Sequence, residues 1–168
     1  ETFVTTLKTR NTVDEIRKQI SDNCLKRAVD AQGIYSLTVP TGGGKTTLLY
    51  AALREINQLA RSIQTVERPV EYILRGAAQY ELSFTGDEAE ALKGVLRGLM
   101  RNAPNVLLLG EIRDREVADM AVQFSLTGHI ALSSMHADGV VGALERLKRF
   151  GLDGDALASQ LLAIVAVR

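Results

Sequence analysis

The sequence predicts a three-layer α/β fold with a mainly parallel sheet. Short apolar runs alternate along the chain with segments of helical periodicity, and this alternation is typical of parallel α/β proteins. Residues 106–109 form a continuous apolar run, as expected of a parallel strand buried on both faces. A glycine-rich loop lies between a predicted strand and a predicted helix, which is where phosphate-binding loops occur in such folds.

The elements follow in order from local patterns. Apolar residues three or four positions apart predict helices at 12–31, 46–59, 87–100, 115–127, 140–150 and 155–167. Runs rich in β-branched, aromatic or aliphatic residues predict strands at 34–39, 62–66, 106–109 and 130–134, with a shorter one at 82–84. Gly33, Pro104 and Gly128 stand where helical segments end. The apolar end of the chain, residues 157–167, is a candidate core helix or docking surface, and we favour a helix whose face packs in the core.

The composition is that of an ordinary globular chain. Of 168 residues, 46% are hydrophobic and 24% charged, and 20 Lys and Arg balance 20 Asp and Glu. This balance gives no support for general binding to nucleic acid or anionic membranes. The single cysteine, Cys24, excludes an internal disulfide and fits a reducing compartment. No apolar run is long enough to span a bilayer.

The glycine-rich loop predicts a nucleoside triphosphate site, with ATP and Mg²⁺ as its ligands. Three successive glycines let backbone N–H groups point into one concavity, and the following helix adds its N-terminal dipole. A lysine then supplies a cation to the terminal phosphates, and a threonine hydroxyl is placed to bind Mg²⁺. The predicted nucleotide-binding residues are Pro40, Thr41, Gly42, Gly43, Gly44, Lys45, Thr46 and Thr47.

Acidic residues and histidines follow later strands. Glu111 comes after the apolar run with one glycine between, at the end of a strand where ligands bind in open parallel sheets. Glu67 ends the strand predicted at 62–66, and Glu71 lies four residues further on. His129 and His136, the chain's two histidines, flank the strand at 130–134. They are candidates for sensing a γ-phosphate, or one is a packed and one an exposed imidazole.

Four ordered motifs resemble a known family. Residues 40–50 resemble its Walker A segment, residues 65–72 its acidic box, residues 110–114 its Walker B segment, and residues 127–129 with 133–136 its histidine box. Together they make the chain similar to the type II secretion and type IV pilus assembly ATPases, hexameric motors with a RecA-like P-loop core. The resemblance covers about three-quarters of the chain, from Pro40 onward. Because four motifs occur in the right order over this length, it is more specific than a lone phosphate loop.

The resemblance implies roles for individual residues. Lys45 and Thr46 would bind phosphate and Mg²⁺, and Glu111 would act beside the metal. Glu67 would be the general base that orients water, and His136 would contact the γ-phosphate. Arg113, and with it Arg97, would contact phosphate or a neighbouring subunit.

The resemblance also implies an assembly and a location. It predicts ATP and ADP as ligands, a homo-oligomer, partners in a secretion or pilus platform, and a cytoplasmic protein peripheral to the inner membrane. We expect one domain, with residues 1–32 as a lead-in of strand and helix and 33–168 as a truncated nucleotide-binding core. The family carries a separate N-terminal domain that supplies trans arginines, so we expect low intrinsic ATP hydrolysis from this chain in isolation.

The segment before the loop has a second resemblance. Residues 12–45 resemble the motif I region of a CRISPR-associated superfamily 2 helicase-nuclease, in which Val39 is acceptable at the first glycine position. No helicase motif follows the loop, so we interpret the chain as a mosaic with a seam in the loop. Two alternatives stay open: a nucleic-acid-dependent ATPase fragment, although nucleic acid is not the expected partner, and a non-catalytic nucleotide-binding module.

Overall fold

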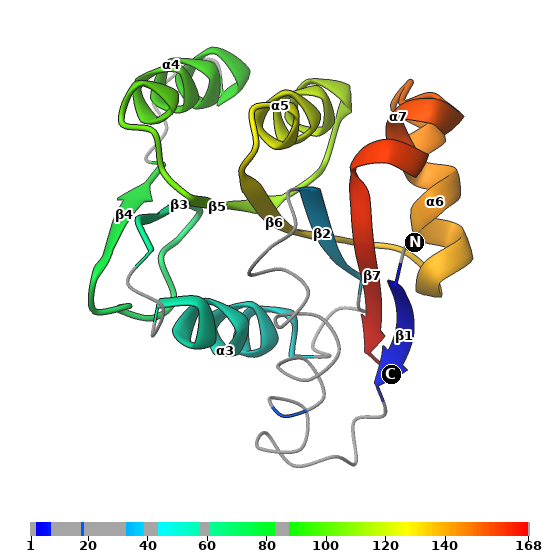
Figure 1. The fold of residues 1–168 in the computed structure, drawn as a ribbon, viewed down its shortest axis with the longest axis horizontal. Coiled ribbons are helices and arrows are strands. Elements are labelled where there is room, and N and C mark those ends of the chain that lie inside the picture. Colours follow the sequence, from blue (N-terminus) through cyan, green and yellow to red (C-terminus); the bar gives the residue numbers. More distant parts are fainter. Residues whose placement is uncertain are drawn as a thin grey trace.

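Within the residues that the structure describes, seven parallel strands form a single sheet. The computed structural model describes residues 3–7, 18, 33–38, 44–57, 61–82 and 88–167. The strand order is β1-β7-β2-β6-β5-β3-β4, and each neighbouring pair is parallel (Figure 1). The strands are β1 Phe3–Leu7, β2 Gly33–Thr38, β3 Ile63–Glu67, β4 Ala77–Glu81, β5 Val106–Glu111, β6 Ile130–Met135 and β7 Leu161–Val167. The predicted parallel α/β class is therefore confirmed.

Helices cover both faces of this sheet. Within the described segments, α3 (Lys45–Asn57) packs on one face, and the other helices lie on the opposite face, as Figure 1 shows. Those helices are α4 Glu88–Arg101, α5 Arg115–Leu126, α6 Gly139–Arg149 and α7 Gly154–Gln160. The result is three layers. The helix predicted at 12–31, including Cys24, lies outside the described residues apart from the helical Lys18.

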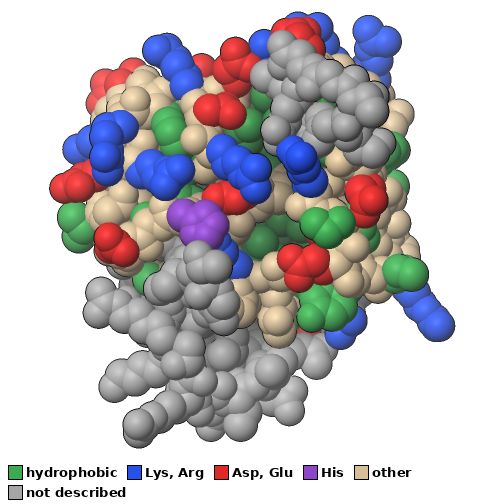
Figure 2. Space-filling view, turned by 180° about the vertical axis from the view of Figure 1, so that it is seen from behind, with side chains coloured by type: hydrophobic (Ala, Val, Ile, Leu, Met, Phe, Trp, Pro, Cys, Tyr) green, Lys and Arg blue, Asp and Glu red, His purple; other side chains and the backbone are tan. Residues whose placement is uncertain are grey.

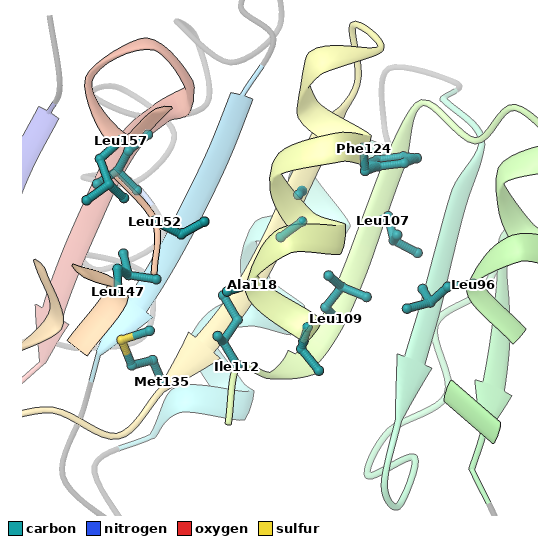
Figure 3. Close-up of a cluster of buried hydrophobic side chains, with 14 of the residues drawn as sticks. Leu96, Leu107, Leu109, Ile112, Ala118, Phe124, Met135, Leu147, Leu152 and Leu157 are labelled. Carbon is teal, nitrogen blue, oxygen red and sulfur yellow. The ribbon is translucent and has the colours of Figure 1, made fainter. Parts of the chain in front are cut away.

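Two hydrophobic clusters lie between the layers because side chains alternate along each strand. In β5, Val106 and Leu108 face α3, whereas Leu107 and Leu109 face α4 and α5. Figure 3 shows the second cluster, in which Phe124 of α5 lies beside Leu107. This explains the continuous apolar run in β5: a parallel strand inside a three-layer fold has no solvent face.

The helix predicted at 155–167 is wrong beyond Gln160. Residues 161–167 form β7, which pairs with β1 on one side and β2 on the other. Ala163 and Val165 pack in the cluster on the α3 face, and Ile164 packs in the opposite cluster. The expectation that this end of the chain is buried was correct. The local pattern does not decide this, because a short apolar run buried on both faces fits a strand or a buried helix equally well.

Two smaller predictions also change. Of the short strand placed at 82–84, Leu82 is not in a strand and residues 83 and 84 lie outside the described residues; the strand that precedes them is β4, Ala77–Glu81. Its side chains are mostly exposed, so it lacks the apolar pattern that would have revealed it. Strand β5 continues two residues beyond the predicted end and includes Glu111. None of the helices in the described part of the chain is both long enough and apolar enough to cross a membrane.

Candidate functional site

A cavity of about 480 Å³ opens at the carboxyl ends of β3 and β5, beside the first turns of α3. Because parallel strands end at the same edge of a sheet, residues distant in sequence meet there. The charged residues that line it are Lys45, Glu67, Arg68, Glu71, Glu111, Arg113, Asp114 and Glu116. Leu49, Tyr50 and Val66 are among its less polar walls. The cavity therefore combines an apolar base with charged groups of both signs.

The end of the glycine-rich loop enters α3 directly. Gly44 has a φ of 84°, in the left-handed region that favours glycine, and its carbonyl accepts the N–H of Leu48 at 3.0 Å. Lys45 is then the first helical residue, and Thr47 is exposed. Of the other predicted nucleotide-binding residues, Pro40, Thr41, Gly42 and Gly43 lie outside the described residues. The Thr46 hydroxyl donates to Glu71 Oε1 at 2.9 Å.

Four of the predicted site residues form one connected cluster. The Lys45 ammonium lies 3.1 Å from both ring nitrogens of His136, and His136 Nε2 lies 3.4 Å from Glu111 Oε1. Arg113 Nε donates to Glu111 Oε2 at 3.0 Å. A neutral imidazole has one N–H and one acceptor nitrogen. The Lys45 ammonium has only N–H donors, so it donates to whichever ring nitrogen of His136 carries no proton.

The charge on Lys45 is opposed by its surroundings. Partial burial lowers the pKa of the Lys45 ammonium from its usual value, because removal from water disfavours the charged form. The negative charge of Glu111 works in the opposite direction, and the positive charge of Arg113 lowers the pKa further. An anion placed beside Lys45 and Arg113 would offset the loss of hydration of the ammonium and the repulsion between the two positive charges. The cluster is thus arranged to accept negative charge.

Glu67 belongs to a separate, buried network on the α3 face of the sheet. Its carboxylate accepts the Tyr50 hydroxyl at 2.7 Å on Oε2 and the Thr65 hydroxyl at 2.6 Å on Oε1. Gln79 Nε2, from β4, lies 3.4 Å from Oε1 and donates to the Tyr50 oxygen at 3.0 Å. Side chains at alternate strand positions share a face, so Thr65 and Glu67 both point toward α3.

Close backbone packing joins β5 to its neighbours at the site. A Cβ on Gly110 would lie 3.3 Å from the Val66 carbonyl oxygen, tighter than usual for such contacts. The Ser134 hydroxyl donates to the Gly110 carbonyl at 2.7 Å. The pairing of β5 with β6 shifts register between Leu109 and Glu111. Gly110 therefore permits the approach that places Glu111 beside the cavity.

Two candidates lie away from this site. His129 directly precedes β6, and His136 directly follows it. The six residues of β6 lie between the two histidines and span about 20 Å. Its ring stacks on Phe124 with centroids 4.9 Å apart, and Nδ1 lies 2.8 Å from the Thr127 hydroxyl. The packed interpretation therefore holds for His129. Arg97 is exposed on α4 and does not line the cavity.

The residues that local patterns missed are Tyr50, Thr65 and Gln79. Buried phenols usually find a hydrogen-bond partner, so Tyr50 among the aliphatic residues on the buried side of α3 was a usable signal. Gln79 carried no such signal, because it lies on a strand that the sequence did not predict. No group of three or more His, Cys, Asp or Glu side chains with a metal-site arrangement occurs in the described segments.

The surface carries charges of both signs. On the face drawn in Figure 2, a row of Lys and Arg side chains passes a histidine, and Asp and Glu side chains lie among them. A polyanion such as DNA needs an extended basic surface, and the mixed charge on this face does not provide one.

Comparison with known proteins identifies the class and the family. The three-layer parallel sheet with its cavity at the carboxyl edge is a RecA-like α/β fold, and the similar solved structures include ATPases and a motor. The chain belongs to the Type II/IV secretion system protein family, whose model matches residues 5–168. The match includes residues 12–45, so the secretion-family similarity does not begin at the loop, and the mosaic with a seam there is corrected.

Individual relatives agree with this assignment. The chain is 42% identical over 163 residues to Type II secretion system protein E of Aeromonas hydrophila, covering 97% of this chain and 30% of the relative. The crystal structure of the pilus retraction motor PilT with bound ADP superposes with a TM-score of 0.76 at 27% identity, covering 86% of this chain and 45% of PilT. The Legionella pneumophila ATPase DotB gives a TM-score of 0.67 at 25% identity, covering 90% and 43%. The chain thus spans about 30% of the length of that curated relative.

Proposed function

We propose that the chain binds Mg-ATP in the cavity at the carboxyl ends of β3 and β5. The observation that carries the proposal is the convergence there of Lys45, Thr46, Glu67 and Glu111 from three separate elements. The α3 N-terminus, with its positive dipole and its first-turn N–H groups, faces the same space and favours a phosphate. The solved structure of PilT contains bound ADP, which supports the same ligand class.

The donor atoms at this edge suit Mg²⁺. The Thr46 hydroxyl and the carboxylates of Glu71 and Glu111 are hard oxygen donors, and Mg²⁺ prefers such donors together with water and phosphate oxygens. We propose that Thr46 and Glu111 hold the ion, directly or through water. When bound, Mg²⁺ would neutralise charge on the phosphates. The Thr46 hydroxyl would keep its hydrogen bond to Glu71, because its O–H donates to the carboxylate while its lone pairs are left for the metal.

We propose that the chain's own carboxylates and cations act on the terminal phosphate. Glu67 would orient and deprotonate the attacking water as general base. Lys45 and Arg113 would stabilise the negative charge that spreads over the transferring group. His136, which holds the Lys45 ammonium without nucleotide, would exchange that contact for one with the γ-phosphate.

The biological role that fits the family is a motor module of a secretion or pilus machine. We propose one domain, with residues 1–32 as the lead-in and 33–168 as the nucleotide-binding core. It would work in a homo-oligomer on the cytoplasmic side of the inner membrane, next to platform proteins. The relatives are about three times longer, so other parts of such a protein, or a second copy, would complete the site. We therefore expect weak turnover from this chain alone.

The test is nucleotide binding by the parent chain and two lysine variants. Lys45→Ala removes an ammonium that would contact phosphate, and hydrogen bonds to charged groups contribute about 1.5–3 kcal/mol. We expect Mg-ATP affinity to fall about 10- to 150-fold by calorimetry. Lys148→Ala, on an exposed position of α6, should leave the affinity unchanged. If Lys45→Ala binds as tightly as the parent, the proposed site is wrong.

Two further measurements separate the alternatives. Native mass measurement during the titration reports whether Mg-ATP assembles the chain into oligomers. Glu111→Gln should retain nucleotide binding but lower hydrolysis, and unaltered hydrolysis would favour a non-catalytic nucleotide-binding module. Stimulation of hydrolysis by single-stranded DNA would favour a nucleic-acid motor, and we expect no stimulation.

A further inference from the structure

The Glu67 carboxylate is held by more donors than its own strand supplies. Glu67 is 6% exposed, and each of its oxygens accepts a short hydrogen bond, from Tyr50 to Oε2 and from Thr65 to Oε1. Thr65 lies on the same strand, but Tyr50 lies on α3, the helix that begins with Lys45. The carboxylate is therefore tied to the helix that carries the proposed phosphate-binding residues.

Gln79 determines the direction of the Tyr50 hydrogen bond. The Gln79 carbonyl oxygen accepts the Leu74 N–H at 2.6 Å, which fixes the orientation of the amide. Its nitrogen then donates to the Tyr50 oxygen at 3.0 Å and to the Tyr72 carbonyl at 2.9 Å. A phenol has a single proton. Since the Tyr50 oxygen already accepts from Gln79, its proton is left for Glu67.

We infer that Tyr50 and Gln79 are positioning residues that hold the Glu67 carboxylate in place for its action on water. The inference rests on the proposed function for the role of Glu67 and extends it to Tyr50, the last residue of the 40–50 segment, and to Gln79 in β4. Tyr50 is five residues after Lys45, about 7.5 Å along a rigid helix. The hydroxyl of Tyr50 thereby sets the position of Glu67 relative to Lys45.

The hydroxyl can be removed without disturbing the packing around it. Tyr50→Phe keeps a ring that is 3% exposed and that meets Tyr72 edge to face with centroids 5.3 Å apart. A general base contributes on the order of 10²- to 10⁴-fold to a rate. Loss of one of the two short hydrogen bonds leaves the carboxylate present but free to rotate. We therefore expect a partial loss, about 10-fold in kcat, with KM for Mg-ATP within about twofold.

The experiment is single-turnover ATP hydrolysis with protein in excess, which detects slow rates. Tyr50→Phe and Gln79→Leu should both slow hydrolysis while nucleotide affinity stays at the parent value. Tyr80→Phe makes the same chemical change at an exposed tyrosine next to Gln79 and should have no effect. In a Glu67→Ala background, Tyr50→Phe should not slow ATP hydrolysis any further. Parent-like hydrolysis by Tyr50→Phe, or an undiminished loss in the Glu67→Ala background, would overturn the inference.

A phenol titration tests the same network without turnover. The chain has four tyrosines. Burial, then the hydrogen bond and charge of Glu67, raise the pKa of the Tyr50 phenol far above its usual value. The Tyr50 phenol should thus resist ionisation in the parent. Its signal should be missing in Tyr50→Phe and should appear at lower pH in Glu67→Gln. If the Tyr50 phenol ionises at the same pH in Glu67→Gln as in the parent, the inference fails even where Mg-ATP binds. If the titration is as expected but Mg-ATP does not bind, only the proposed function fails.

Discussion

Replacing Thr65 by valine removes one hydroxyl from the Glu67 network and little else. Thr65 is fully buried in β3, and valine has nearly the same size and the same β-branched shape. The lost hydrogen bond, 2.6 Å to Glu67 Oε1, is a short one to a carboxylate. Hydrogen bonds to charged groups contribute about 1.5–3 kcal/mol, so we expect the free energy of unfolding to fall by about 2 kcal/mol. The remaining donor to Oε1, Gln79, lies 3.4 Å away and compensates little.

Urea unfolding followed by far-UV circular dichroism measures this change. With a denaturant slope of about 2 kcal/mol/M, the midpoint should move down by about 1 M at unchanged slope. Thr47→Val is the matched control, because Thr47 is exposed and surface substitutions usually change stability by less than about 0.5 kcal/mol. If Thr65→Val unfolds at the parent's urea concentration or above it, the hydroxyl does not stabilise the carboxylate and the network is wrongly described.

Two further predictions concern packing and pH. Ile164→Ala in β7 should lower the free energy of unfolding by about 2–5 kcal/mol, because Ile164 is fully buried, whereas Val141→Ala at a 69% exposed position should change it by less than about 0.5 kcal/mol. A small effect of Ile164→Ala would argue against a central β7. The raised pKa of Tyr50 means that the folded state keeps a proton which the unfolded chain releases near pH 10. This stabilisation is present below pH 10 and is lost as pH rises above it. The parent should therefore lose more free energy of unfolding between pH 9 and 11 than Tyr50→Phe does. Equal losses would contradict the raised pKa of Tyr50.

The two networks at the cavity divide the proposed work between them. Lys45, His136, Glu111 and Arg113 form a polar cluster that is open to solvent on the arginine side, where Arg113 is 57% exposed. Such a cluster can rearrange when a phosphate enters, because solvent-exposed ion pairs contribute little energy. Glu67 is buried among fixed donors and is held in one orientation. In the proposed site, groups that can rearrange would thus surround the ligand, and a firmly held carboxylate would face it.

Local sequence patterns determined most of the strands and helices of this fold. The helices at α3, α4, α5 and α6, and the strands β2, β3, β5 and β6, all lie within a few residues of their predicted places. Each has either a one-sided apolar stripe or a short two-sided apolar run, and both signals are contained within the segment itself. The positions of Glu67 and Glu111 at strand ends followed from the same patterns.

Only the tertiary structure decided the last strand, β7, the edge strand β4 and the set of residues that form the site. Residues 161–167 are a strand because β1 and β2 stand on either side to receive their hydrogen bonds, and no local pattern contains those partners. The contact between Lys45 and His136 joins positions 91 residues apart. Tyr50 and Gln79 reach Glu67 from a helix and an edge strand whose neighbours in space are not neighbours in sequence. Periodicity reports which face of an element is buried, whereas pairing in a parallel sheet depends on crossovers, and these bring the chemistry of the site together.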